Sequence, residues 1–176
     1  MRIPLLLLIT VTLTASAFTA ITVINWQIKD DTYSVKFDTK GASGIFKGLK
    51  GTIDFDETDL QHSNFNVAID VNTINTGNGM KNRHAKGEGF FDAEKYPTIQ
   101  FQSLKIEKTA TAFLTTGNLR IKNITKKITF PFTFENKNSE GVFRGNFEVN
   151  RNDFNLNRKG VGDNIKIELV VPVKKS

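Results

Sequence analysis

Few side chains in this sequence could perform covalent or metal chemistry. The 176 residues contain no cysteine and two histidines, His62 and His84. This composition excludes thiol nucleophiles, cysteine–zinc sites and iron–sulfur clusters. A Ser-His-Asp hydrolase would need one of the two histidines as its base, yet the sequence has neither a nucleophile elbow nor an HExxH zinc motif. We therefore predict that the protein is not an enzyme and holds no metal or catalytic cofactor.

Binding chemistry is better represented, in the run Lys81-Asn82-Arg83-His84. An ammonium and a guanidinium can hold a phosphate through charge-assisted hydrogen bonds, and an amide or imidazole N–H can donate to a carbonyl oxygen. We identify Lys81, Asn82, Arg83 and His84 as candidate ligands of a polar group. The alternative is a solvated helix face, with Asn82 or His84 only tying the segment to a strand end.

The elements that would position these residues are strands. Apolar and polar residues alternate with a period of two along most of the chain, and clusters of turn residues separate the runs. The alternating runs are 33–37, 53–55, 65–71, 99–101, 119–121, 128–134, 143–149 and 165–173, with turns at 41–44, 57–63, 135–141 and 158–162. This pattern predicts an all-β fold, an eight-stranded antiparallel lipocalin-like β-barrel.

The segment from Thr76 to Pro97 breaks the alternation. Asn78 is a suitable helix N-cap, so the sequence predicts a short helical segment near residues 78–86. We expect this segment to cover one end of the barrel, with Phe90 and Phe91 reaching into its mouth.

The N-terminus carries one positive charge at Arg2, a short apolar stretch and then small residues including Ala17 and Ala20. This order is typical of a secretory signal peptide. We predict a signal peptide over residues 1–20, cleavage after Ala17 or Ala20, and a single domain over residues 21–176 that is periplasmic or secreted and does not span the membrane after processing.

The formal net charge is +6, but no run of five or more like charges occurs. The densest basic groups are Lys126-Lys127, Arg158-Lys159 and Lys174-Lys175. Scattered bases of this kind form a solvated surface, so we predict no nucleic-acid partner.

Several short motifs occur together between residues 26 and 173. They are Gly89-Phe90-Phe91-Asp92-Ala93, Tyr96-Pro97-Thr98-Ile99, Phe101-Gln102-Ser103, Gly117-Asn118-Leu119-Arg120-Ile121 and Arg151-Asn152-Asp153-Phe154. Together they resemble motifs of the YceI-like family of secreted bacterial lipocalin-like proteins, most specifically from His84 to Ser103. The family commonly has an Arg-Asp pair before the histidine and a leucine after it, whereas this chain has Lys81, Asn82 and Ala85 there.

The resemblance implies a non-catalytic carrier or sequestering protein that binds an isoprenoid or similar amphiphilic lipid, such as an isoprenoid quinone or a polyprenyl phosphate. Lys81, Asn82, Arg83 and His84 would then meet the headgroup, and inward-facing apolar residues would line a tunnel for the tail. The tunnel residues are Phe37, Phe55, Phe65, Ile69, Phe91, Phe101, Ile121, Phe130, Phe132, Phe147, Ile165, Ile167 and Leu169.

The alternation by itself does not separate a hollow barrel from a filled one, because inward Phe, Ile and Val suit both. The alternative function is therefore a secreted stress-response or interaction module with a filled barrel and no physiological lipid. A homodimer is compatible with either function.

Overall fold

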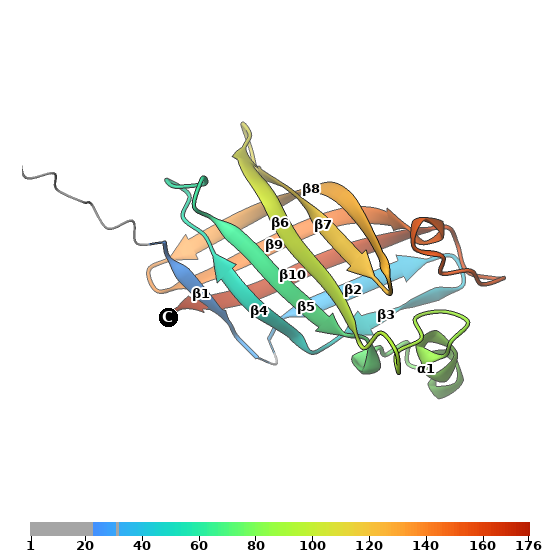
Figure 1. Ribbon diagram of the computed structural model, residues 1–176. Coiled ribbons are helices and arrows are strands. Elements are labelled where there is room, and N and C mark those ends of the chain that lie inside the picture. The colour runs from blue at the N-terminus through green and yellow to red at the C-terminus, as the bar shows by residue number, and fades with distance from the viewer. Residues whose placement is uncertain (1–22, 31) are drawn as a thin grey trace, which may run out of the picture.

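The computed structural model describes residues 23–30 and 32–176, and this part of the chain forms ten strands in one sheet (Figure 1). The predicted signal peptide lies outside the described residues. The strands are β1 (Asn25–Ile28), β2 (Ser34–Thr39), β3 (Ala42–Phe46), β4 (Leu49–Asp54), β5 (Asn64–Asp70), β6 (Thr98–Lys108), β7 (Phe113–Ile121), β8 (Ile124–Lys137), β9 (Glu140–Asn150) and β10 (Asn164–Lys175). Three short helices join them: η1 (Val71–Thr73), α1 (Gly79–Lys86) and η2 (Arg151–Phe154).

The ten strands make an eight-stranded antiparallel barrel. β2 pairs with β10 from Lys166 to Val170, and β1 pairs with the end of β10 from Val173 to Lys175, so β1 and β2 together occupy one position in the ring. β3 and β4 share the next position in the same way, and the remaining strands follow in chain order. The β1–β10 pairing closes the sheet, which removes the free edges of the ring. The predicted fold class is confirmed.

Two strands, β1 and β3, were not predicted from the sequence. The residues of β1 alternate over only four positions, which is too short a run to be distinctive. Residues 41–44 were predicted to be a turn, but the turn is confined to Lys40 and Gly41, and β3 begins at Ala42. Gly44 is needed for close approach, since a Cβ there would collide with the Asn75 carbonyl and the Phe37 ring.

β1 and the C-terminus lie at one end of the barrel (Figure 1). Buried aromatic side chains fill this end. Trp26, Phe55 and Val173 are at most 1% exposed there. The ring of Phe55 lies 5.1–5.9 Å from five other phenylalanine rings, which are those of Phe65, Phe113, Phe132, Phe134 and Phe143. Most of these contacts are edge-to-face, the arrangement that aromatic quadrupoles favour. This end is therefore a packed core.

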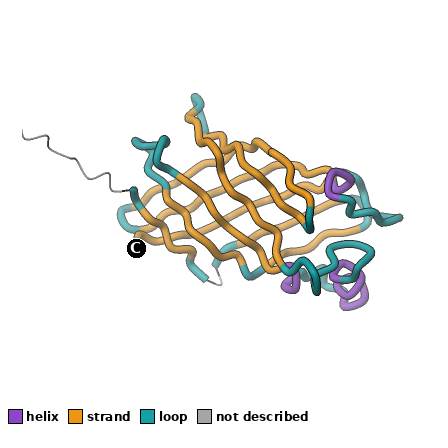
Figure 2. The backbone as a smooth tube through the Cα atoms, viewed as in Figure 1, coloured by secondary structure: helices purple, strands orange, loops and turns teal. Residues whose placement is uncertain are grey.

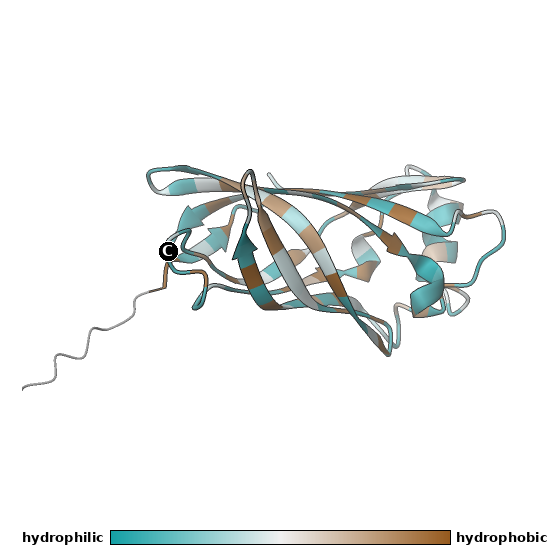
Figure 3. Cartoon of the chain, turned by 90° about the horizontal axis from the view of Figure 1, so that it is seen from above, coloured by the Kyte–Doolittle hydropathy of each residue, from teal (hydrophilic) through white to brown (hydrophobic). Residues whose placement is uncertain are grey.

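The opposite end carries α1, the β2–β3 hairpin and the loop between β9 and β10 (Figures 1 and 2). α1 begins as predicted, because the Asn78 side chain accepts a hydrogen bond from the Lys81 N–H at 3.0 Å. Apolar and polar residues alternate along the strands between the two ends (Figure 3). Across the described residues, no helix is long and apolar enough to cross a membrane.

Candidate ligand-binding cavity

The half of the barrel nearest α1 is hollow. The cavity has a volume of about 380 Å³ and is lined by the inward faces of β2 to β10 together with α1 and the β9–β10 loop. This volume lies within the range of small-molecule sites in proteins, which is about 300–1,000 Å³. Its wall is made almost entirely of aliphatic and aromatic side chains, so it suits an apolar ligand.

Most of the residues that were predicted to line a tunnel do line this cavity. The lining includes Phe37, Phe65, Ile69, Phe91, Phe101, Ile121, Phe130, Phe132, Phe147, Ile165, Ile167 and Leu169. Ile165, Ile167 and Leu169 point inward yet are only half-buried, because the space in front of them is empty. Whether these residues bind a ligand stays a prediction.

Phe55 is the exception and corrects that prediction. It is 0% exposed and does not line the cavity. Its inward direction was read correctly from the alternation, but it sits one level below the cavity, inside the packed aromatic cluster. The sequence pattern reports which face a residue occupies and not whether the space in front of it is filled.

Two groups of lining residues were missed. Phe46 and Leu49 lie between the turn predicted at 41–44 and the alternating run at 53–55, where no strand was predicted. Gly145 also lines the cavity, at a position between Phe143 and Phe147 in the alternating run 143–149. A glycine at an inward position of a strand is typical of a bend or a close backbone approach.

The mouth is roofed by the segment that follows α1. Phe90 and Phe91 are 7% and 6% exposed, and the Phe91 ring packs edge-to-face on Phe46 at 6.0 Å. Both phenylalanines line the cavity together with Ala85 of α1. The aromatic cover expected from the sequence is therefore present at this end.

The four candidate headgroup residues are divided by the structure. Lys81 and His84 line the cavity, whereas Asn82 and Arg83 do not. The Asn82 Oδ1 accepts hydrogen bonds from the Thr76 N–H at 2.8 Å and from its hydroxyl at 2.7 Å. Asn82 therefore has a structural role, but it ties α1 to the preceding loop and not to a strand end. Arg83 is exposed on the helix because successive residues of a helix point in different directions.

Arg158 and Lys159, in the β9–β10 loop, line the cavity beside Lys81 and His84. The sequence had assigned this pair to a solvated surface, because it belongs to no run of five or more like charges. Lys81 Nζ donates to the Gly41 carbonyl at 3.2 Å, which joins α1 to the β2–β3 hairpin. Among the described residues no Asp or Glu lines the cavity. The mouth therefore offers positive charge to a ligand.

Arg151 holds the β9–β10 loop in place. It is 7% exposed, and its guanidinium donates to the carbonyls of Leu156, Val161 and Gly162 and to the Asp163 carboxylate. The Gly162 N–H also donates to the Lys40 carbonyl at 2.9 Å. These bonds fix the loop against the β2–β3 hairpin and so fix the position of Arg158 and Lys159.

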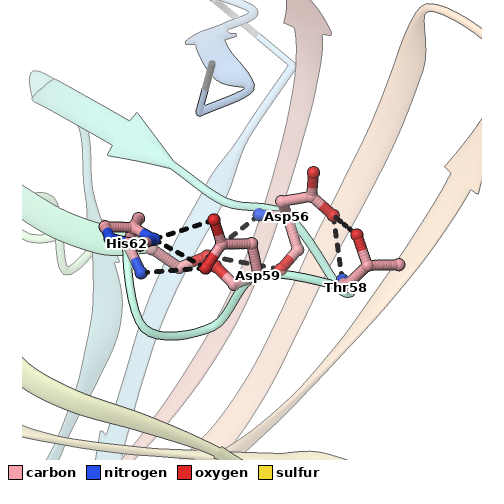
Figure 4. A network of polar contacts seen from close by, with 5 residues as sticks. Asp56, Thr58, Asp59 and His62 are labelled. Atoms are coloured by element: carbon pink, nitrogen blue, oxygen red, sulfur yellow. Dashed lines mark hydrogen bonds and ion pairs between the residues drawn. The ribbon is translucent and has the colours of Figure 1, made fainter. Parts of the chain in front are cut away.

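The second histidine lies far from the mouth, in the β4–β5 loop (Figure 4). His62 Nδ1 is 2.8 Å from both carboxylate oxygens of Asp59. The Ser63 hydroxyl donates to the Asp59 carbonyl and accepts from the Asp56 N–H, so it bonds to the backbone instead of to His62. Within the described chain, no group of three or more His, Asp or Glu side chains is placed to hold a metal ion.

A closed antiparallel barrel with an apolar interior cavity and one covered mouth has the architecture of the lipocalin-like barrels. A family profile described as the YceI-like domain matches residues 26–173. The chain belongs to the YceI-like family.

Similar proteins agree with this assignment. A UPF0312 protein of Yersinia pestis is 27% identical over 137 residues, which cover 74% of this chain and 71% of that protein. The crystal structure of BcnA from Burkholderia cenocepacia has a TM-score of 0.79 with 25% identity, over 83% of this chain and 99% of that one. A polyisoprenoid binding domain from Saccharophagus degradans has the same fold, with a TM-score of 0.67 and 11% identity over 88% and 100% of the two chains.

Proposed function

We propose that this protein is an exported carrier or sequestering protein, and that it binds the apolar tail of an isoprenoid or similar amphiphilic lipid inside its barrel without catalysing a reaction. The observation that carries the proposal is the apolar cavity of about 380 Å³ whose charged lining residues are all cationic. Burial of apolar surface contributes about 25 cal/mol per Å², so a hydrocarbon tail in this cavity is a strong source of affinity. The name of the S. degradans domain, which shares the fold, supports an isoprenoid tail.

The charge at the mouth supports an anionic headgroup. Arg144 and Arg151 also line the cavity, but Arg144 pairs with Glu135 at 3.5 Å and Arg151 donates its hydrogen bonds to the β9–β10 loop. Lys81, Arg158 and Lys159 remain at the mouth. A phosphate or carboxylate placed there would gain charge-assisted hydrogen bonds, and a neutral headgroup would gain less.

The test is to purify the mature protein from its native host without detergent and to identify extracted lipids by mass spectrometry. We expect an amphiphile with an isoprenoid or comparable tail. Ile69→Lys should come out largely free of lipid, because it places a charge on the apolar wall. Asn66→Lys, on the outer face of the same strand, should retain the lipid. Folded wild-type protein that carries no lipid, and that takes up none from a host lipid extract, would contradict the proposal and favour the interaction module.

Export is a separate part of the proposal. The short apolar stretch and small residues of 1–20 support cleavage after Ala17 or Ala20. N-terminal sequencing of the protein from its host should begin at Phe18 or Ile21. An intact Met1 on membrane-bound material would instead support an anchored form.

A further inference from the structure

Three segments that lie at the mouth of the barrel are joined into one surface. They are α1, the turn of the β2–β3 hairpin and the β9–β10 loop (Figure 1). Lys81 Nζ donates to the Gly41 carbonyl at 3.2 Å, and the Gly162 N–H donates to the Lys40 carbonyl at 2.9 Å. Gly41 also packs closely on Gly160, since a Cβ at Gly41 would collide with the Gly160 carbonyl. We call this surface the mouth rim, which comprises residues 40–41, 79–86 and 155–163.

The mouth rim carries an excess of positive charge. Its one acidic residue, Asp163, is paired with Arg151 at 2.8 Å. Exposed carboxylates flank the rim at Glu88, Glu94 and Asp153. They are outnumbered by the cations of the rim, which are Lys40, Lys81, Arg83, Lys86, Arg158 and Lys159. Among the described residues none of these cations forms an ion pair, so they are available to an external anion.

The mouth rim also exposes an apolar side chain, that of Met80. Met80 is 66% exposed, more than any other large hydrophobic residue in the described part of the chain. Residues three or four positions apart are neighbours on a helix, so Met80 lies beside both Arg83 and His84. His84 lines the cavity. An apolar side chain, a cation and the entrance to the cavity therefore lie on the same side of α1.

This combination matches the chemistry of an anionic lipid bilayer. Lipid phosphates attract Lys and Arg side chains near the surface, and an apolar side chain gains by entering the layer beneath the phosphates. A nucleic acid or another polyanion would contact the cations but would leave Met80 in water. The presence of Met80 among the cations therefore favours a bilayer.

We propose that the mouth rim is a docking surface for an anionic lipid bilayer, with Met80 inserted at the headgroup level and the surrounding cations bound to lipid phosphates. Docking places the entrance of the cavity against the bilayer and requires no ligand in the barrel. Its consequence rests on the lipid-binding function proposed above: a lipid tail can pass between bilayer and cavity with less exposure to water.

The experiment is sedimentation of delipidated full-length mature protein with lipid vesicles. One set of vesicles is phosphatidylcholine alone, and the other contains about one-third phosphatidylglycerol. We expect the wild type to bind the anionic vesicles about 100-fold more tightly than the neutral ones. Raising the salt concentration from about 0.05 M to about 0.5 M should remove most of this difference.

Lys40 and Arg83 separate docking from recognition of a headgroup, because both belong to the rim and neither lines the cavity. The double variant Lys40→Gln, Arg83→Gln should bind anionic vesicles about 25-fold more weakly, at about fivefold for each cation. Without vesicles it should keep the wild-type affinity for farnesyl monophosphate. The matched control is Lys108→Gln, Lys137→Gln, which removes the same charge at the opposite end of the barrel and should leave vesicle binding within about twofold.

Met80→Ser tests the apolar part of the docking surface. It should weaken binding to anionic vesicles by about fivefold, because the inserted side chain loses its apolar contacts. Leu104→Ser is the control, since Leu104 is 55% exposed in the half of β6 that leads away from α1 (Figure 1). This variant should bind as the wild type does.

Four results would overturn the docking surface. They are equal wild-type binding to both kinds of vesicle, equal losses in the two double variants, loss of farnesyl monophosphate binding in Lys40→Gln, Arg83→Gln, and wild-type vesicle binding by Met80→Ser. The last would indicate a polyanionic partner instead of a bilayer. Vesicle binding as expected by a protein that takes up no lipid would count against the function proposed above and would leave the docking surface standing.

Discussion

The rings of Phe55 and Phe132 meet edge-to-face with their centroids 5.6 Å apart, and the boundary between the packed and hollow halves of the barrel runs between them. Both side chains point inward from their strands. Phe132 also borders the cavity. Phe55 is fully buried and contacts other phenylalanine rings, including those of Phe113 and Phe134. A single barrel therefore contains a hydrophobic core and an apolar cavity, one above the other along its axis.

This division predicts unequal costs for truncating inward phenylalanines. Phe55→Ala should lower the free energy of unfolding by about 4 kcal/mol, because it leaves a void in a packed cluster. Phe147→Ala enlarges a space that is already empty and should cost about half as much. Urea unfolding of the two delipidated variants measures both values. Equal losses would mean that the two ends of the barrel are equally packed.

The mouth predicts a preference for charge. A triple variant in which Lys81, Arg158 and Lys159 are each changed to Gln should bind farnesyl monophosphate about tenfold more weakly. A benzoquinone with the same tail should lose little affinity, and added salt should mimic the substitution for the phosphate alone. Calorimetric titration of delipidated protein measures both. Arg83→Gln is the control, because Arg83 does not line the cavity and the variant should leave both affinities unchanged. An equal loss of affinity for both lipids in the triple variant would assign Lys81, Arg158 and Lys159 a structural role.

The loop before α1 depends on the acceptor oxygen of Asn82. Asn82→Ala removes the partner of the Thr76 N–H and hydroxyl and should cost about 1 kcal/mol of stability. Asn82→Asp keeps an acceptor oxygen at the same place and should keep the stability. Hydrogen exchange at the Thr76 amide, compared with thermal unfolding, reports the local effect. Equal fast exchange in both variants would show that the bond is not maintained in solution.

The β4–β5 loop predicts a stability change in acid. The Thr58 hydroxyl and N–H donate to Asp56 Oδ1 at 2.7 and 2.8 Å, and these bonds hold the pKa of Asp56 below the ordinary aspartate value of 3.8 (Figure 4). A pKa that is lower in the folded state stabilises the fold fully above the unfolded-state value, and the contribution is lost as pH falls toward the folded-state value.

The matched variant for this loop is Thr58→Val, which removes the hydroxyl donor and keeps the backbone one. It should lower stability at neutral pH by about 0.5 kcal/mol, because solvent screens this exposed contact, and should differ less from the wild type at about pH 3. Chemical unfolding at the two pH values is the measurement. A difference that stays constant with pH would show that the Asp56 carboxylate is not the group stabilised by Thr58.

The sequence by itself determined the barrel, the inward faces and the helix near the mouth. These features are local: alternation along a strand assigns each residue to a face, and Asn78 caps the helix through a neighbour three residues away. The same local reasoning placed Ile69, Phe101 and Ile167 on the inner wall.

Only the tertiary structure decided which inward residues enclose space and which cations share the mouth. Phe55 and Phe132 have the same pattern in the sequence, yet the convergence of six phenylalanines from different strands fills the space at one and leaves it open at the other. Lys81 and Arg158 meet at the cavity although 77 residues separate them. Closure of the ring by β1 and β10 brings such distant segments together, and no local pattern encodes how much volume that closure encloses.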